Sequence, residues 1–328
     1  MTESFAVPDL TELLSTLRVV TLPLNTKFRG VTQREIALFE GPEGWSEFSP
    51  FLEYEAAESS QWLRAAIEFA WMPTPPPLRK MIPVNATLPA VSTEDVEKVL
   101  ARYGTFGTVK VKVAERGQSL ADDVARLARV RELYPDVKLR IDANGAWTIL
   151  RAREALAQLA EFELEYVEQP CATVEELAEL RSEGLGLLIA ADESIRKAAD
   201  PYRVAELEAA DLMVVKAQPL GGIERVLKLI EELPLQAVVS SALESSIGLS
   251  QGLALAAAPP ELNYASGLGT ATLFAQDIVT EPLLMCDGML ELRRPVPDAA
   301  LLGKHQSTPE REAWWRERIT DCYSLLSN

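Results

Sequence analysis

Histidine and cysteine are scarce in this chain of 328 residues. The single histidine, His305, excludes metal sites built from several histidines and restricts any Ser/His/Asp triad to that one position. The three cysteines are an odd number and show no Cys-x-x-Cys spacing, so they indicate neither a disulfide framework nor a zinc ribbon. We therefore expect a reducing compartment, and most hydrolase chemistry is disfavoured.

Basic charge and long apolar runs are also lacking. Acidic residues outnumber basic ones by 49 to 32, and the resulting net charge of −17 disfavours binding to nucleic acid. No run approaches the roughly 18 apolar residues of a membrane span, and the N-terminus has neither the basic nor the apolar region of a signal peptide. We expect a cytoplasmic protein without a membrane segment, and a monomer, because no extended exposed apolar segment stands out.

Residues 72–77 contain four prolines and interrupt the chain. Prolines lack the amide donor and hold the backbone extended, so this segment predicts a domain junction. Before it, residues 22–39 have a strand-like pattern and residues 61–70 a helical one. We expect Trp314 and Trp315, in a helix-like segment near the C-terminus, to pack against this N-terminal part.

After the junction, short apolar runs alternate with amphipathic helical stretches, which is typical of strand-helix units around a parallel sheet. The predicted strands cover residues 109–113, 137–142, 164–168, 187–192, 212–216 and 236–240, and the predicted helices cover 119–134, 148–161, 173–183, 200–209, 222–232 and 247–258. Six units plus short flanks predict an α/β fold with a closed (β/α)₈ barrel. The competing fold is an open doubly wound sheet, but no G-x-G-x-x-G fingerprint or P-loop follows any of the strands.

Polar residues stand at the end of every predicted strand. These residues are Lys112, Asp142, Glu168, Asp192, Lys216 and Ser240, at intervals of 30, 26, 24, 24 and 24 residues. One strand, its helix and two loops need about that many residues in a barrel, so these side chains occupy equivalent positions in successive units. We expect them to meet in space.

Side-chain alternation places these charges on one face of each strand. Lys110 and Lys112 share a face, as do Arg140 and Asp142, so charged groups are predicted to line the barrel lumen. An unpaired ion there would cost several kcal/mol. The alternative interpretation is that the charges form structural pairs, or that they face the helices instead.

Three carboxylates without histidine suit a hard cation. Asp142, Glu168 and Asp192 offer the oxygen ligands that Mg²⁺ prefers, and Glu193 is left to a supporting role because alternation favours Asp192. A lysine close to a cation and other ammonium groups has a lowered pKa and can act as a general base. Proton removal alpha to a bound carboxylate would give an enediolate whose charge Mg²⁺ stabilises.

The motifs resemble the enolase superfamily, in the subgroup of muconate lactonizing enzyme. They are Lys-Val-Lys at 110–112, Asp-Ala-Asn at 142–144, Glu-Gln-Pro at 168–170, Asp-Glu-Ser at 192–194, and Lys216 followed by Gly-Gly at 221–222. Residues 44–50 are similar to a segment of the capping domain of these enzymes. The resemblance implies an α+β capping domain from residues 1–80, to which residues 295–328 return, and a barrel domain from residues 81–294.

Within the superfamily, Arg140, residues 142–147 and residues 240–248 are most similar to the o-succinylbenzoate synthase family of menaquinone biosynthesis. That resemblance implies Mg²⁺-dependent dehydration of 2-succinyl-6-hydroxy-2,4-cyclohexadiene-1-carboxylate. Lys112 would remove the alpha proton and then protonate the departing hydroxide. Lys216 would stabilise the dianion by a cation-π contact from the opposite face, and Lys110 would lower the pKa of Lys112.

The resemblance also implies substrate contacts from Arg140, Ser240 and Gly267. For Ser240 a turn-forming hydroxyl is the alternative, and for residues 267–270 a plain loop. The loop at residues 28–30 is either a lid over the barrel mouth or an ordinary hairpin turn.

Two other functions stay open at this stage. A racemase of N-acylamino acids or an epimerase of dipeptides, from the same superfamily, also needs a lysine on each face of its substrate. A non-catalytic metal-binding or scaffold protein is the alternative of another class.

Overall fold

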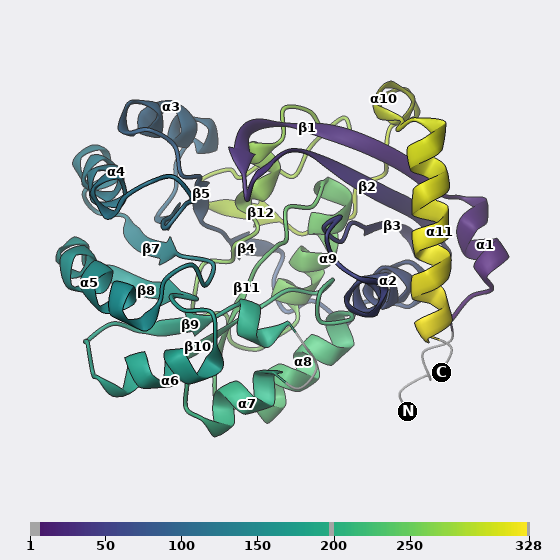
Figure 1. Ribbon diagram of the computed structural model, residues 1–328. Coiled ribbons are helices and arrows are strands. Elements are labelled where there is room, and N and C mark those ends of the chain that lie inside the picture. The colour runs from purple at the N-terminus through teal and green to yellow at the C-terminus, as the bar shows by residue number, and fades with distance from the viewer. Residues whose placement is uncertain (1–6, 197–199, 327–328) are drawn as a thin grey trace.

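A computed structural model of the protein describes residues 7–196 and 200–326. The chain forms a barrel of parallel strands surrounded by helices, with a smaller part built from both ends of the chain on one side (Figure 1). None of the described helices is long and apolar enough to cross a membrane.

The smaller part is an α+β capping domain. Its sheet has the order β1-β2-β3 and is antiparallel, formed by β1 (Arg18–Phe28), β2 (Val31–Gly41) and β3 (Gly44–Phe48). Its helices are α1 (Leu10–Ser15), α2 (Ala56–Trp71), α10 (Ala299–His305) and α11 (Pro309–Leu326). Trp315 of α11 is fully buried and packs edge-on against the Phe48 ring, in an apolar cluster that also contains Trp62.

The barrel domain has seven parallel strands in the order β11-β10-β9-β8-β7-β6-β5. These are β5 (Ala86–Leu88), β6 (Thr108–Lys112), β7 (Lys138–Asp142), β8 (Leu164–Glu168), β9 (Ile189–Ala191), β10 (Leu212–Val215) and β11 (Gln236–Val239). The helices that follow them are α3 (Val96–Leu100), α4 (Leu120–Leu133), α5 (Ile149–Leu159), α6 (Val174–Ser182), α7 (Asp200–Glu206), α8 (Ile223–Glu232) and α9 (Ser246–Ala257).

The barrel closes through residues 266 and 267. Ser266 forms a parallel bridge with Val84 beside β5, and Gly267 forms one with Ser240 beside β11. The amide of Gly267 donates to Val239, and the carbonyl of Ser266 accepts from Asn85. This short segment takes the place of an eighth strand, which excludes the open doubly wound alternative. A 3₁₀ turn at Gly269–Leu273 follows it.

Each strand buries its two faces in different surroundings. One face packs against the helices in the largest apolar cluster, which includes Val109, Val111 and Ile141. The other face points into the lumen, where a small cluster contains Tyr166, Ala190, Leu212, Val214 and Val238. The predicted alternation is therefore correct: Lys112, Asp142 and Glu168 point into the lumen and not toward the helices.

Candidate active site

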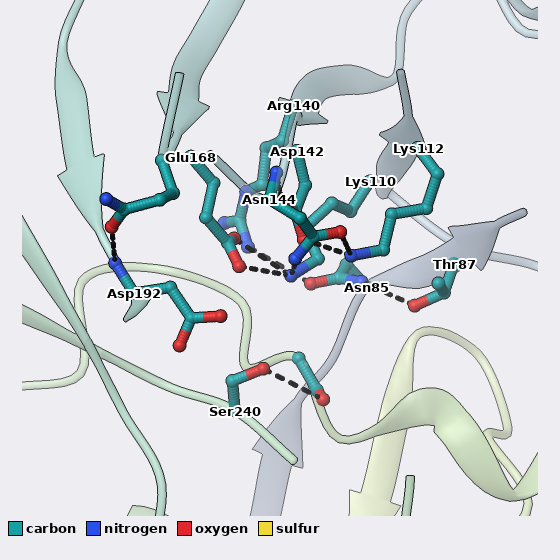
Figure 2. A network of polar contacts seen from close by, with 12 residues as sticks. Asn85, Thr87, Lys110, Lys112, Arg140, Asp142, Asn144, Glu168, Asp192 and Ser240 are labelled. Atoms are coloured by element: carbon teal, nitrogen blue, oxygen red, sulfur yellow. Dashed lines mark hydrogen bonds and ion pairs between the residues drawn. The ribbon is translucent and has the colours of Figure 1, made fainter. Parts of the chain in front are cut away.

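A polar cavity lies at the carboxyl ends of the barrel strands. It is lined by the predicted residues Lys110, Lys112, Asp142, Glu168, Asp192, Lys216, Ser240 and Gly267. Figure 2 shows side chains from β6, β7 and β8 and from the segments after β9 and β11 converging on one space. The structure thus brings together eight of the nine predicted site residues.

Strand register explains why the first three groups meet. Lys112 of β6 is the Cα partner of Asp142 of β7, and Asp142 is the partner of Glu168 of β8. Because strands in register place equivalent residues about 5 Å apart, the three side chains form a row across the lumen. Asp192 and Lys216 follow the last residues of β9 and β10 and extend the row.

Each carboxylate of the row pairs with a lysine. Lys110 Nζ donates to both oxygens of Glu168 at 2.8 and 2.9 Å, and Lys216 Nζ donates to both oxygens of Asp192 at 2.7 Å. Lys112 Nζ bonds Asp142, and it also donates to Asn144 Oδ1 at 2.6 Å. All six charged groups are buried, and each carboxylate is paired with a lysine, as the alternative interpretation of paired charges expects.

Neighbouring charges give the two lysines of β6 different electrostatic properties. Burial lowers the pKa of Lys112, and the ammonium of Lys110 and the guanidinium of Arg29 act in the same direction, while Asp142 opposes them. Burial also disfavours the charge on Lys110, but Glu168 and Asp142 outweigh it and raise the pKa of that lysine. Lys112 is therefore the better candidate for a neutral base, and Lys110 for a permanent cation.

The carboxylates are also differentiated. Although burial opposes it, pairing with Lys112 and Lys110 lowers the pKa of Asp142, and pairing with Lys216 lowers that of Asp192. Burial and the charge of Asp142 raise the pKa of Glu168 to about 7. Of the three carboxylates, Glu168 is therefore the one whose ionised form is least stable in this site, and added positive charge would stabilise that form.

The lysines lie on opposite sides of the lumen. Lys112 belongs to β6 and Lys216 follows β10, and these strands are four positions apart in the barrel order, which is half of its circumference. The three carboxylates come from the strands between them. A planar group bound in the cavity would have one ammonium group on each face.

The donor set fits a divalent cation such as Mg²⁺. All three carboxylates are buried and supply only oxygen ligands, which is the set that this cation prefers. Within the described residues no group of three acidic, histidine or cysteine side chains has the spacing of a metal site, and each of the three carboxylates is paired with a lysine. The three ammonium groups and three carboxylates of the row balance in formal charge, so a dication and a dianionic ligand together would preserve that balance.

Ser240 and Gly267 stand together on the wall of the cavity opposite the row of charges. A Cβ atom on Gly267 would collide with the Ser240 hydroxyl and lie 3.1 Å from Ser240 Cβ. The neighbouring Ser241 hydroxyl bonds the Gly267 carbonyl and Thr270 Oγ1, each at 2.8 Å. This polar wall is where the barrel closes.

Arg140 is the predicted site residue that does not line the cavity. Its guanidinium is fully buried one layer deeper, where Nε donates to Glu165 at 2.6 Å and Nη1 donates to the Ala265 carbonyl at 2.6 Å. It also lies over the ring of Tyr166, with 4.7 Å between Cζ and the ring centroid. Pairing between β7 and β8 skips Glu165, and this bulge explains how Glu165 reaches Arg140.

The loop at residues 28–30 is both a hairpin turn and a cover. Phe28 pairs with Val31 at the tip of the β1–β2 hairpin, and Phe28 and Arg29 line the cavity. The Phe28 ring centroid is 5.3 Å from Lys112 Nζ, and Arg29 Nη2 is 3.5 Å from Glu193 Oε1. The two alternatives for this loop therefore describe the same feature.

Sequence reasoning gave no role to several residues of the cavity, among them Thr87 and Asn144, and Ser241, Ala242 and Leu243 of the segment after β11. Thr87 comes from β5, a strand of three residues that was too short to predict. Asn144 belongs to a motif that was recognised, yet its contacts were not foreseen: its amide nitrogen Nδ2 donates to Glu193 at 3.1 Å, while its oxygen accepts from Lys112.

Comparison with known proteins identifies relatives along nearly the whole chain. Residues 92–300 match the family described as enolase C-terminal domain-like, and residues 19–70 match the enolase N-terminal domain-like family. An o-succinylbenzoate synthase of Mycolicibacterium smegmatis is 53% identical over 98% of this chain and 99% of its own length. One of Mycobacterium tuberculosis is 52% identical over 98% of this chain and 97% of its own length.

Solved structures share the fold at lower sequence identity. A muconate lactonizing enzyme of Pseudomonas fluorescens complexed with muconolactone has a TM-score of 0.78 at 18% identity, covering 89% of this chain and 98% of that one. An N-succinyl Arg/Lys racemase of Bacillus cereus has a TM-score of 0.75 at 21% identity, covering 89% and 97%.

Proposed function

The chain belongs to the o-succinylbenzoate synthase family of the enolase superfamily, and from this premise we propose that it dehydrates 2-succinyl-6-hydroxy-2,4-cyclohexadiene-1-carboxylate to o-succinylbenzoate, a step of menaquinone biosynthesis. One structural observation carries the proposal. Two buried lysines face each other across a cavity whose intervening strands supply three carboxylates.

Enzymes of this superfamily generally depend on Mg²⁺. In this chain Asp142, Glu168 and Asp192 would hold the cation. When bound, Mg²⁺ supplies positive charge to the carboxylate oxygens of the substrate, where negative charge develops as the alpha proton leaves.

Lys112 is the proposed general base. Its lowered pKa favours the neutral amine, which removes the alpha proton and becomes an ammonium group on the same face as the leaving hydroxyl. That ammonium then donates its proton to the departing hydroxide, so one residue performs both transfers. Lys110 keeps its charge, and its ammonium adds to the effect of burial, which is the main cause of the lowered pKa of Lys112.

Lys216 acts from the other side of the ring. Its ammonium group is buried, so water does not screen it, and it stabilises the planar anion by a cation-π contact. Phe28 and Arg29 of the hairpin tip exclude water from the side of Lys112. The hydroxyl of Ser240 and the backbone at Gly267 are proposed to bind the succinyl end of the substrate, and Arg140 contributes by fixing the layer beneath the site.

Racemisation of N-acylated amino acids is the second candidate. Two opposed lysines could remove a proton from one face of an alpha carbon and deliver one to the other, so the same geometry supports it. We place dehydration before racemisation, because the relatives that are more than half identical to this chain are named o-succinylbenzoate synthase.

Purified protein with Mg²⁺ should be incubated with each substrate type. We expect rapid loss of the cyclohexadiene and formation of o-succinylbenzoate. Exchange of the alpha hydrogen of an N-succinylamino acid for deuterium, without any dehydration, would replace the first function by the second. Absence of both reactions in folded, Mg²⁺-loaded protein would support the non-catalytic alternative.

We also propose an oligomeric state and a cellular compartment for the protein. A net charge of −17 and three cysteines without disulfides support a monomer in the cytoplasm that acts on a small carboxylate and not on nucleic acid. Light scattering should then give the monomer mass of 36.1 kDa.

A further inference from the structure

One wall of the cavity is held in place by the capping domain. The wall loop, residues 240–245, connects β11 to α9, and its residues Ser240, Ser241, Ala242 and Leu243 line the cavity. Two buried ionisable residues of the capping sheet contact this loop from behind. They are Arg34 of β2 and Glu47 of β3, which are 3% and 1% exposed and do not line the cavity.

Glu47 binds the end of the wall loop and the start of α9. Its Oε2 accepts hydrogen bonds from the backbone amides of Ser245 and Gly248, both at 3.1 Å, and from the Ser245 hydroxyl. The Ser49 hydroxyl donates to Oε1 at 2.6 Å and orients the carboxyl group. Gly248 leaves room for this contact, because a Cβ atom there would lie 2.8 Å from Glu47 Cδ.

Arg34 binds the middle of the wall loop. Its Nε donates to the Leu243 carbonyl at 3.1 Å, its Nη2 donates to the Ser49 carbonyl, and its guanidinium lies over the Phe51 ring at 4.2 Å. The contact falls on a strained residue, since Leu243 has a φ of +68°, a left-handed conformation that is unfavourable for a bulky side chain. Arg34 therefore gives this strained residue a hydrogen-bond partner outside the loop.

We propose that Arg34 and Glu47 are positioning residues that hold the wall loop in the shape that binds the part of the substrate remote from the lysines. The inference rests on the proposed function for the identity of the substrate. It assigns the capping domain a role in binding through two residues that never touch the substrate. The competing explanation is that both residues only stabilise the contact between the domains.

Steady-state kinetics of matched variants separate these explanations. Arg34→Met and Glu47→Ala remove the hydrogen bonds, whereas Arg34→Lys keeps a donor and Glu47→Gln keeps an acceptor oxygen. Glu35→Gln is the control, because Glu35 lies next to Arg34 but pairs with Arg311 and Trp315 inside the capping domain, at 2.7 and 2.8 Å. Thermal melts of every variant measure the loss of stability separately.

We expect Arg34→Met and Glu47→Ala to raise KM at least about tenfold while kcat stays within about threefold, because remote binding contacts are lost and the lysines stay in place. The conservative variants should recover most of the wild-type KM. Glu35→Gln should lower Tm and leave KM unchanged. An unchanged KM in both disrupting variants, or an equal rise of KM in Glu35→Gln, would overturn the proposal.

Amide hydrogen exchange tests the same role without turnover. Residues 240–248 should exchange faster in Glu47→Ala and Arg34→Met than in the wild type, and Glu35→Gln should leave them unchanged. If Glu47→Ala does not fold, the comparison of Arg34→Met with Arg34→Lys, by KM and by amide exchange, tests the proposal instead. A wild-type protein without dehydration activity would contradict the proposed function, while equal exchange in all variants would contradict the positioning role.

Discussion

Two lysines separated by one residue on β6 have opposite electrostatic environments. Lys110 donates to both oxygens of Glu168 and keeps its proton, whereas Lys112 lies near the Phe28 ring with two other cations nearby and gives its proton up more easily. Sequence alternation predicts that both point into the lumen. It cannot predict which one is the base, because that depends on neighbours contributed by β8 and by the hairpin tip.

Replacing Lys112 by alanine should remove catalysis and preserve the fold. Asp142 would still have Lys110 Nζ at 3.5 Å, so its buried charge keeps a partner. We expect kcat/KM for dehydration to fall by about 10²–10⁴-fold or more, the usual contribution of a general base. Lys138→Ala, which removes an exposed lysine of β7, is the control and should keep full activity. Full activity in Lys112→Ala would contradict the assigned role.

Glu47 predicts a pH dependence of stability. Its burial, together with the charge of Glu244, raises its pKa from the ordinary 4.5 to about 8. Between these values the folded protein holds a proton that the unfolded chain has released, so this stabilisation is complete below pH 4.5 and is lost as the pH rises through 8.

Denaturant unfolding at several pH values measures this effect. From about pH 5 to about pH 8 the free energy of unfolding of the wild type should fall relative to that of Glu47→Gln, by at most about 1.4 kcal/mol per pH unit. Parallel curves for the two proteins would show that Glu47 does not titrate in this range.

At the scale of elements, the helices and strands of the barrel domain were largely predictable. The six predicted helices agree with α4 to α9 within three residues, and the six predicted strands agree with β6 to β11 within two. Their apolar periodicity and caps are local properties, as in the capping box of Thr173 and Glu176. By contrast, β5 has three residues and the closing segment has two, which is too short for any periodicity.

Closure of the barrel gives a prediction at Gly267. In Gly267→Ala the new Cβ would collide with Ser240, so either the closing segment or the wall loop must move. We expect a loss of about 1–3 kcal/mol in the free energy of unfolding, as for other overpacked sites, together with a higher KM. Gly107→Ala is the control, because a Cβ there meets nothing within 4 Å. Urea unfolding that is equal for both variants would contradict this close contact.

At the scale of the whole molecule, the candidate site was predictable because polar side chains recur at the ends of successive strands. Charged groups at the ends of successive strands indicate a shared cavity, because parallel strands end at the same edge of a barrel. The depth of a side chain was not predictable in this way: Arg140 shares a face with Asp142 but lies two residues, or about 6.6 Å, further down the strand.

Contacts between the domains were also beyond sequence reasoning. Glu47 and Ser245 are 198 residues apart in the chain, and no spacing or periodicity connects them. The pairing becomes visible only when the antiparallel capping sheet is placed against the start of α9, as in Figure 1. The proposed site therefore depends on the packing of two domains as well as on the barrel.

Titration calorimetry with Mg²⁺ tests the central claim most directly, namely that carboxylates from three neighbouring strands hold the cation on which catalysis depends. The wild type should bind one Mg²⁺. We expect each of the variants Asp142→Asn, Glu168→Gln and Asp192→Asn to weaken Mg²⁺ binding by at least about tenfold, because mutating a residue that only hydrogen-bonds a metal ligand already lowers metal affinity by about that factor. Glu154→Gln removes an exposed carboxylate of α5 that pairs with Arg151 outside the barrel lumen, and this variant should bind Mg²⁺ like the wild type. Titrations of the three ligand variants that cannot be distinguished from the wild type would contradict the account.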